Sequence, residues 1–395
     1  MNIKRLLSLP EQQRSVFLWG PRKTGKSWWL REHCGQAPLV DLLQTEVFAE
    51  YASRPSLLRE RAESEVWRRE SKTLVIDEIQ RVPALLDEVH WLIENRGLRF
   101  VLTGSSARKL RRSHANLLGG RAWRRELRPF CLAELWAHPV PEGLPAFKLE
   151  DCFVSGLLPP HYLSPRPAED LRAYVADYLR EEIAAEAQVR NLPGFVEFLR
   201  VAALTSAELL NYVNVAREVG VSAKVVRGYF EILEDTLLGF RVSPWRKSRT
   251  RRMILTDKFY LFDVGVMNHL ARRAPKAGTP EFGKSFEQLV LQELLAYRAY
   301  RAPDLELTYW RTSTGHEVDF VVDDKRLAVE VKSSPRVHDV DLAGLTALAE
   351  DGAVKKRLLV AAVREPQVLR DRWGNVQVLP LRHFVDALWS GDLVK

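Results

Sequence analysis

The eight residues from Gly20 to Ser27 read GPRKTGKS and fill every fixed position of the pattern G-x-x-x-x-G-K-[ST]. They follow a short apolar run, Val16 to Trp19, and precede a stretch from Trp28 that can continue as a helix. A glycine-rich turn between a strand and a helix lets successive backbone N–H groups point into one concavity, where the positive end of the helix adds its attraction for phosphate. The segment therefore predicts an α/β unit with a site for a nucleoside triphosphate.

Every residue of this phosphate loop is expected to line the nucleotide: Gly20, Pro21, Arg22, Lys23, Thr24, Gly25, Lys26 and Ser27. Lys26 should reach the β- and γ-phosphates of ATP, and Ser27 should ligate Mg²⁺. The alternative is a chance turn rich in glycine, serine and lysine, which the strand-loop-helix context disfavours.

A second buried strand should end in an acidic residue beside this loop, and Leu74 to Glu78 (LVIDE) supplies it. Asp77 is predicted to hold Mg²⁺, and Glu78 to orient and deprotonate the water that attacks the γ-phosphorus. The pair favours hydrolysis over binding alone. An apolar run followed by two acids also ends ordinary strands, so this interpretation depends on the phosphate loop that precedes it.

Two more apolar runs, Pro38 to Leu42 and Arg99 to Ser106, read as strands. The second ends in polar residues, and Thr103, Ser105 or Ser106 could sense the γ-phosphate there. A parallel sheet flanked by helices is the simplest assembly of these runs.

The composition bounds the class of protein. A chain of 395 residues is too long for one small core, so two or three domains are expected. No apolar run approaches membrane-spanning length, and the polar break near the start comes too early for a secretory signal, so we expect a cytoplasmic protein without a membrane partner. Cys34, Cys131 and Cys152 lack the spacing of a disulfide framework or a zinc cluster, and we expect reduced, mostly buried thiols.

The net charge of +8 is concentrated in two clusters, each with a tryptophan. The Arg108–Arg128 cluster includes Trp123 and holds Arg108, Lys109, Arg111, Arg112, Arg121, Arg124, Arg125 and Arg128. The Arg241–Arg252 cluster includes Trp245 and holds Arg241, Arg246, Lys247, Arg249, Arg251 and Arg252. Arginines interleaved with aromatic rings suit base stacking and phosphate contacts, so DNA is the expected partner. A solvated basic face is the alternative for both clusters.

Within the first cluster, Arg121 directly follows Gly119 and Gly120. It could act as a catalytic residue by projecting toward a nucleotide bound to a neighbouring subunit, where its charge would stabilise the transferring phosphoryl group. That role requires a homo-oligomer. A surface arginine in a glycine turn is an equally good interpretation.

The middle of the chain predicts two consecutive helices. The first runs from Leu210 to Gly220, and the second opens with Ser222 as its N-cap. Its apolar positions recur at helical spacing and leave Lys224 and Arg227 outside; they are Val225, Val226, Tyr229, Phe230, Leu233 and Leu237. The alternating stretch Leu237 to Leu261 then suits a β-hairpin wing. The pattern resembles a winged helix-turn-helix, a fold that also serves as a protein-binding module or as an ATPase lid.

The last third carries a second group of acidic residues. Asp319 lies in a strand-like run, a turn follows at Asp323 to Lys325, and Glu330 and Lys332 share one face of the next strand. This D-x(n)-E-x-K arrangement is typical of metal-dependent nucleases, in which two carboxylates hold Mg²⁺ and the lysine orients a water. Glu287, in the amphipathic helix Phe286 to Tyr297, could complete the metal shell. The same charges can also persist as purely structural pairs.

Taken in order, these motifs resemble a prokaryotic family that joins an AAA-type P-loop ATPase domain to a C-terminal DUF4143 region. The resemblance spans nearly the whole chain and rests on GPRKTGKS, LVIDEIQ, LTGSSA, GGR with a following RPF, LNYVNVAREVG/SAKVV, KFYLFDVG and GHEVDF/VEVK. It implies an ASCE-type ATPase core, a winged-helix segment and an end similar to PD-(D/E)xK nucleases. It also implies that Glu78 and Lys332 are catalytic, and that Ser27, Asp77, Glu287, Asp319 and Glu330 bind metal. Val318 replaces the proline of the nuclease name, which leaves the carboxylate intact.

The expected fold class is α/β: an AAA+/ASCE P-loop parallel sheet, then a helical winged-helix segment, then an α/β PD-(D/E)xK nuclease-like domain. Proline-rich stretches place the domain boundaries, which gives domains at residues 1–155, 156–275 and 276–395. The expected function is Mg²⁺-dependent ATP binding and hydrolysis coupled to action on DNA, with a winged-helix module that contacts DNA and a metal-dependent nuclease-like domain whose cleavage activity is left open. The alternative is an ATPase switch or scaffold whose nuclease-like domain is catalytically silent and docks protein or DNA.

Overall fold

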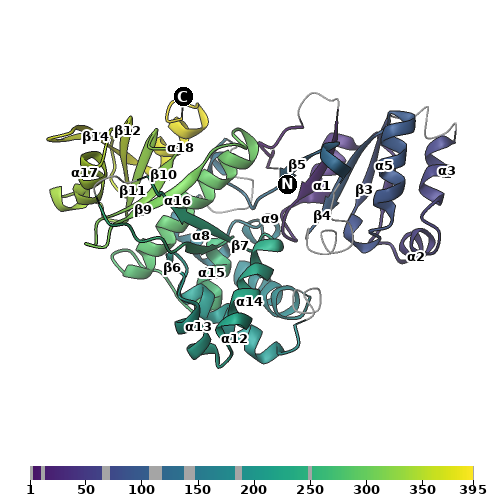
Figure 1. The fold of residues 1–395 in the computed structure, drawn as a ribbon, viewed down its shortest axis with the longest axis horizontal. Helices are drawn as coiled ribbons and strands as arrows, with labels where there is room; N and C mark the ends of the chain where they lie inside the picture. Colours follow the sequence, from purple (N-terminus) through teal and green to yellow (C-terminus); the bar gives the residue numbers. More distant parts are fainter. Residues whose placement is uncertain are drawn as a thin grey trace. The chain divides into compact units, whose positions relative to one another are not determined.

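The computed structural model describes residues 3–9, 14–64, 72–105, 118–137, 147–182, 189–247 and 251–394 (Figure 1). Contacts between residues divide the chain into two compact units. The N-terminal unit comprises Arg5–Pro129 and Asp235–Leu237, and the C-terminal unit comprises Met1–Lys4, Phe130–Glu234 and Leu238–Lys395. The predicted three-domain division stays a prediction.

The N-terminal unit is built on a five-stranded, all-parallel sheet with the order β2-β3-β4-β1-β5. Its strands are β1 (Ser15–Trp19), β2 (Leu39–Asp41), β3 (Thr73–Asp77), β4 (Arg99–Gly104) and β5 (Ala122–Glu126). The predicted parallel sheet is therefore confirmed, but β5 was missed. Its sequence, AWRRE, is charged and only partly buried because the strand lies at the edge of the sheet, so it lacks the apolar signal of the four predicted runs.

Helices cover the sheet of the N-terminal unit: α1 (Lys26–Cys34), α2 (Thr45–Ser53), α3 (Leu57–Glu63) and α5 (Leu85–Arg96), with short 3₁₀ turns at η1 (Ile79–Arg81) and η2 (Leu118–Gly120). The inner strands are apolar along their length, as expected for a sheet that is covered on both faces. Phe17, Ile76 and Phe100 from three neighbouring strands are at most 1% exposed and belong to one core cluster with residues of α3 and α5. This packing fixes the carboxyl ends of β1, β3 and β4, where the candidate nucleotide site lies.

The first part of the C-terminal unit is helical. Its helices are α7 (Leu132–Trp136), α8 (Leu149–Ser155), α9 (Pro159–Tyr162), α10 (Pro167–Ala173), η3 (Tyr174–Glu182), α12 (Leu192–Leu204), α13 (Tyr212–Val219), α14 (Ala223–Asp235) and α15 (Val264–Ala271). The predicted helix pair is present as α13 and α14. Gly220 ends α13 in the left-handed region (φ 74°), and the Ser222 hydroxyl accepts from the Val225 N–H at 3.3 Å. The expectation that Val225 is buried was wrong: it is 39% exposed, because the inward stripe of α14 runs through Val226, Tyr229 and its neighbours.

The rest of the C-terminal unit forms a nine-stranded mixed sheet with the order β13-β14-β12-β11-β10-β9-β7-β8-β6. The strands are β6 (Glu208–Leu209), β7 (Gly239–Pro244), β8 (Lys258–Leu261), β9 (Leu307–Arg311), β10 (Glu317–Val322), β11 (Leu327–Lys332), β12 (Lys356–Ala361), β13 (Gln367–Asp371) and β14 (Gly374–Pro380). The helices are α16 (Pro280–Tyr300), η4 (Asp339–Leu342), α17 (Ala343–Glu350) and α18 (Leu381–Trp389). Figure 1 shows α16 running along the sheet, and α16 and α17 belong to two different core clusters.

Two pairs of strands correspond to predicted hairpins. β7 pairs with β8 antiparallel within the stretch that was predicted as a wing. β10 pairs with β11 antiparallel, and the turn between them holds Asp323, Asp324 and Lys325 at positive φ. The winged-helix and nuclease-like interpretations of these elements remain predictions.

A buried carboxylate ties α8 to α15. Asp263 is the N-cap of α15 and accepts from the Val266 N–H at 3.0 Å and from the Leu157 N–H at 2.7 Å. Burial raises the pKa of Asp263 to about 6, although these backbone hydrogen bonds oppose the shift. The two backbones approach closely here: a Cβ on Gly265 would lie 2.2 Å from the Gly156 nitrogen. This crossing is a point at which only glycine fits.

The three cysteines are free, with Cys131 and Cys152 buried and Cys34 partly exposed, as expected. Within the described ranges, no helix combines the length and the apolar character needed to cross a bilayer.

Candidate functional site

The phosphate loop joins β1 to α1 in the N-terminal unit. Lys23 (φ 67°) and Gly25 (φ 91°) adopt left-handed backbone conformations, which turn the N–H groups of the loop toward one concavity. Gly20 is required by close packing, because a Cβ there would lie 2.3 Å from the Leu127 carbonyl oxygen. The absence of side chains at Gly20 and Gly25 leaves room for phosphate oxygens, so the shape of the loop fits a nucleotide.

Lys26 is the first residue of α1 and is 6% exposed. Its ammonium donates to the carbonyl oxygens of Gly20 at 2.8 Å and Pro21 at 3.2 Å, and it lies 3.9 Å from the Glu78 carboxylate. Burial lowers the pKa of Lys26, and the carboxylates of Glu78 and Asp77 oppose that shift. The Lys26 ammonium therefore lies among polar groups, and a bound phosphate could replace the loop carbonyl oxygens as its hydrogen-bond acceptor.

Asp77 ends β3 next to the start of α1. Its carboxylate accepts from the Ser27 hydroxyl at 2.9 Å and from the Thr103 hydroxyl of β4. Burial raises the pKa of Asp77, and these two hydrogen bonds oppose the shift. A serine hydroxyl and a carboxylate oxygen are hard donors of the kind that Mg²⁺ prefers, and here they are already in contact, so this pair fits a magnesium ion that is shared with a nucleotide.

Glu78 is buried and held in an unusual backbone conformation, with φ 60° and ψ 46°. Strained left-handed residues other than glycine gather at functional sites. The Glu78 carboxylate accepts from the side-chain amide of Gln80, and the same amide donates to the Ser105 hydroxyl at 3.1 Å. The backbone N–H of Glu78 donates to the Thr103 hydroxyl at 3.2 Å. Thr103 and Ser105, predicted as γ-phosphate sensors, thus contact the two acids; Ser106 lies outside the described residues.

Two residues that support the site were not singled out from the sequence. Arg5 is 4% exposed and donates to the Thr24 carbonyl at 2.7 Å and to the Arg128 carbonyl at 2.6 Å, so it supports the phosphate loop from behind. Gln80 holds Glu78 as described above. Arg5 lies in none of the quoted motifs, because its partners are backbone carbonyls distant in sequence. Gln80 ends the LVIDEIQ motif, but the sequence analysis gave its side chain no role.

The remaining predicted residues of the N-terminal unit have other partners. Arg121 forms an ion pair with Glu94 of α5 in its own chain, so the structure does not bring it to Lys26. Arg128 was counted in the Arg108–Arg128 cluster but is 3% exposed and pairs with Glu126 at 2.5 Å, so it is not available to a partner. Arg108, Lys109, Arg111 and Arg112 lie outside the described residues.

In the Arg241–Arg252 cluster, acids of the chain neutralise several of the cations. Arg241 pairs with Glu234 at 2.8 Å, Lys247 pairs with Asp324 at 2.8 Å, and Arg251 pairs with Glu350. Arg246 and Arg252 are exposed, and Arg249 lies outside the described residues. Trp245 was expected to stack on bases, which is wrong. It is 6% exposed, because its indole N–H donates to Asp324 and the Lys325 ammonium covers its ring.

The acidic residues of the last third do converge. Glu287 from α16, Asp319 from β10, and Glu330 and Lys332 from β11 all line one cavity of about 890 Å³. The Asp319 carboxylate accepts from the Val331 N–H at 2.9 Å, and Lys332 donates to Glu330 at 2.5 Å. Burial and the neighbouring Glu330 raise the pKa of Asp319 well above its usual range, and burial raises the pKa of Glu330 to about 7.

Among the charged residues that line this acidic cavity and that the sequence analysis did not single out are Lys258 of β8 and Glu317 of β10. The Lys258 ammonium is 3.6 Å from Glu287, 3.7 Å from Asp319 and in direct contact with Glu317. Among the described residues, no group of three or more acidic, histidine or cysteine side chains is arranged to hold a metal ion. Because the Lys258 ammonium already occupies the carboxylates of Glu287, Glu317 and Asp319, the cavity does not fit Mg²⁺ as the residues stand.

Family models match three parts of the chain. An AAA domain covers residues 12–136, a domain of unknown function, DUF8612, covers residues 146–277, and a second one, DUF4143, covers residues 282–384. These matches confirm the resemblance seen in the order of the motifs.

The relatives of known sequence include uncharacterized proteins of Mycobacterium tuberculosis and Mycobacterium bovis. Each is 25% identical over 318 residues, which is 78% of this chain and 67% of the relative. Solved structures with some likeness include the ORC2 protein of Aeropyrum pernix in its ADP form, at 13% identity and a TM-score of 0.31, covering 66% of this chain and 88% of that one. Domain III of the replication initiation protein DnaA of Thermotoga maritima follows, at 15% identity and a TM-score of 0.23, covering 57% of this chain and 86% of that one.

Likenesses as low as these carry no conclusion about function. The family models and the phosphate loop do agree with each other: an AAA domain matches residues 12–136, which contain the loop, and DUF4143 matches residues 282–384.

Proposed function

We propose that the N-terminal unit binds ATP and hydrolyses it. The observation that carries this proposal is the convergence of four side chains from two motifs that are about fifty residues apart in sequence. Ser27 contacts Asp77 at 2.9 Å, and Lys26 lies 3.9 Å from Glu78, at the point where the phosphate loop meets the end of β3.

Each group has a distinct task in the proposed reaction. The loop amides and Lys26 bind the phosphate chain and hold it in line for attack. Ser27 and Asp77 would hold Mg²⁺, which supplies positive charge to the transferring phosphoryl group. Glu78 accepts a proton from the attacking water and orients that water. The Thr103 hydroxyl donates to the Asp77 carboxylate and accepts from the Glu78 backbone N–H, which leaves the Glu78 carboxylate free of Thr103.

Replacing Lys26 tests the proposal directly. Wild-type protein should bind a fluorescent ATP analogue and release phosphate from ATP, and Lys26→Ala should lower phosphate release by about 100-fold or more because it removes the charge at the transferring group. The exposed Lys72→Ala is the matched control and should behave as wild type. Wild-type protein that neither binds nor hydrolyses ATP would refute the proposal.

The three-domain organisation, with boundaries after residues 155 and 275, is part of the same proposal. In it, α13, α14, β7 and β8 form a winged helix, and the sheet around β10 and β11 forms a PD-(D/E)xK-like core. A helix, a glycine turn at Gly220, a second helix and an antiparallel strand pair occur in the order expected for a winged helix, which supports the first assignment.

DNA contact through α14 is the proposed partner interaction of this winged helix. Lys224 and Arg227 are exposed on the first turns of α14, a position from which side chains reach phosphates or bases. The ion pairs within the Arg241–Arg252 cluster leave α14 as the stronger candidate surface in this unit.

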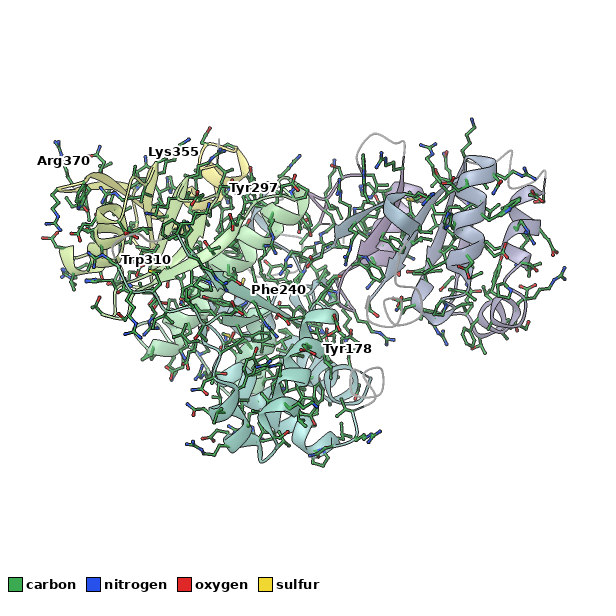
Figure 2. All side chains as sticks on the ribbon, in the orientation of Figure 1. Tyr178, Phe240, Tyr297, Trp310, Lys355 and Arg370 are labelled. Carbon is green, nitrogen blue, oxygen red and sulfur yellow. The ribbon has the colours of Figure 1, made fainter. Side chains whose placement is uncertain are left out.

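Salt dependence distinguishes this contact from weak general attraction. The double substitution Lys224→Ala and Arg227→Ala should reduce the slope of log affinity against log salt by about 2, because two phosphate contacts are lost. The control replaces two exposed arginines at the opposite end of the nine-stranded sheet, Arg364→Ala and Arg370→Ala (Figure 2). Fluorescence anisotropy with labelled duplex at several salt concentrations measures the slopes. If both double variants show the same slope of log affinity against log salt, DNA does not contact α14.

The scaffold alternative gains weight from the acidic cavity. A site in which a lysine contacts the carboxylates has no free metal shell, so a catalytically silent DUF4143 domain that docks a protein or DNA fits the side chains better than a metal-dependent nuclease does. Homo-oligomerisation with Arg121 acting on a neighbouring nucleotide remains part of the proposal; it requires Arg121 to leave Glu94.

A further inference from the structure

The acidic cavity of the C-terminal unit contains a cation that belongs to the chain itself. Lys258 is the first residue of β8 and is 3% exposed, which is unusual for a lysine and requires compensation by anions. Its ammonium lies within 4 Å of three carboxylates, those of Glu287, Glu317 and Asp319, which come from two different elements.

The surrounding side chains fix these carboxylates in place. The Tyr260 hydroxyl donates to Glu287 at 2.6 Å, and Arg311 pairs with Glu317 at 3.0 Å. Lys258 also lies 5.5 Å above the ring of Tyr309, so an aromatic face supports the ammonium from another side. Three carboxylates within 4 Å and an aromatic face surround the Lys258 nitrogen, and this negative surrounding favours the charged ammonium.

A divalent ion and this ammonium compete for the same oxygens. Mg²⁺ requires oxygen ligands at about 2.0–2.1 Å in octahedral geometry, which would bring it within a few ångströms of the Lys258 nitrogen. Two cations at that separation repel strongly in a buried site. The Glu330 carboxylate has one oxygen available to a ligand: among the residues that the structure describes, the buried Oε2 has no hydrogen-bond partner, whereas Lys332 donates to the other oxygen.

We infer that Lys258 is the resident counter-ion of this cavity, that it excludes divalent metal from Glu287, Glu317 and Asp319, and that a latent divalent-cation site appears when its charge is removed. Lys258 thus decides whether the DUF4143 domain holds metal. This inference goes beyond the proposed ATP hydrolysis and does not depend on it.

The first test compares metal binding by wild-type protein and Asp319→Asn in the absence of nucleotide. Titration with Mn²⁺, followed by the electron paramagnetic resonance signal of free Mn²⁺, counts bound ions without any catalytic assay. The two proteins should bind Mn²⁺ alike, because Asp319 is already paired with Lys258. A Mn²⁺ ion that wild-type protein binds and Asp319→Asn does not would overturn the inference.

The second test removes the charge of Lys258 and keeps its approximate volume. Lys258→Met should gain one Mn²⁺ site with affinity at least ~10-fold above wild type, because the competing cation is gone. That site should vanish in the double variant Lys258→Met, Asp319→Asn. Lys355→Met, an exposed lysine of the same unit (Figure 2), should gain nothing.

Thermal unfolding provides a readout that does not depend on ion counting. Lys258→Met should melt below wild type in a chelator, since Glu287, Glu317 and the buried Asp319 all lose the ammonium that neutralises them, and Mn²⁺ should recover the loss. A folded Lys258→Met protein that gains neither a Mn²⁺ site nor Mn²⁺-dependent stability would refute the latent site. If Lys258→Met does not fold, Mn²⁺ binding by wild-type protein and by Asp319→Asn is the deciding comparison: equal binding supports the inference, and a Mn²⁺ site that is lost in Asp319→Asn refutes it. Since no test uses ATP, failure here leaves the proposed hydrolysis unaffected.

Discussion

Glu78→Gln should lower ATP turnover by about 10²–10³-fold while the affinity for MgATP stays within a few-fold of wild type. Glutamine keeps the shape of the side chain but cannot take a proton from water. The nucleotide contacts of Lys26, Ser27 and Asp77 remain, since Ser27 and Asp77 hold each other and do not depend on Glu78. Phosphate release at saturating ATP measures turnover, and a fluorescent ATP analogue measures affinity.

The exposed Glu32→Gln on α1 carries the same chemical change outside the site and serves as the control. A loss of affinity as large as the loss of turnover would show that Glu78 shapes the binding site and is not the base. Unchanged turnover would assign the proton transfer to another group, and the role proposed for Glu78 would have to be abandoned.

Gly265→Ala should destabilise the C-terminal unit by about 3 kcal/mol or more. The added Cβ would lie 2.2 Å from the Gly156 nitrogen, 2.5 Å from the Gly156 Cα and 2.8 Å from the Ser155 carbonyl carbon. These are backbone atoms of the end of α8, so no rotamer change relieves the overlap. Moving α8 would also break the hydrogen bond from the Leu157 N–H to Asp263, which is 2.7 Å long.

The control substitution is Gly228→Ala, also inside a helix of the same unit. Nothing lies within 4 Å of the position of its Cβ, and alanine has the higher helix propensity, so this change should stabilise α14 by about 0.5–1 kcal/mol. In thermal unfolding followed by circular dichroism, Gly265→Ala should melt about 6 °C or more below wild type, and Gly228→Ala at or above it. Equal midpoints for the two variants would contradict the close backbone crossing.

The nucleotide site was largely predictable because its signals are local. The phosphate loop carries its glycines, its lysine and its serine within eight residues, and the two acids after β3 follow an unbroken apolar run. A parallel sheet aligns the ends of such strands, so the motifs meet without further information. What the sequence could not supply was the support behind the loop, since Arg5 bonds to backbone carbonyls that any residue provides.

The C-terminal unit was harder to predict because its partners are determined by tertiary packing. Trp245 stands among basic residues in the sequence and nevertheless lies under Lys325, far along the chain. Lys258 is the first residue of β8, whose sequence KFYL is that of an ordinary apolar strand. Only the pairing of β8 with β7 and the packing of α16 bring this lysine to Glu287. Asp319, Glu330 and Lys332 were brought together as predicted, because a hairpin is a local structure.

The positions of the strands in the sequence also set the order in which the protein can mature on the ribosome. All strands of the N-terminal unit lie before residue 127, whereas the nine-stranded sheet begins at Glu208 and closes only with β14, which ends at Pro380. Domains that are complete early in the chain fold first during translation. The parallel sheet of the N-terminal unit can therefore form before the strands that complete the other sheet have been made, and the proposed binding of ATP would stabilise it at that stage.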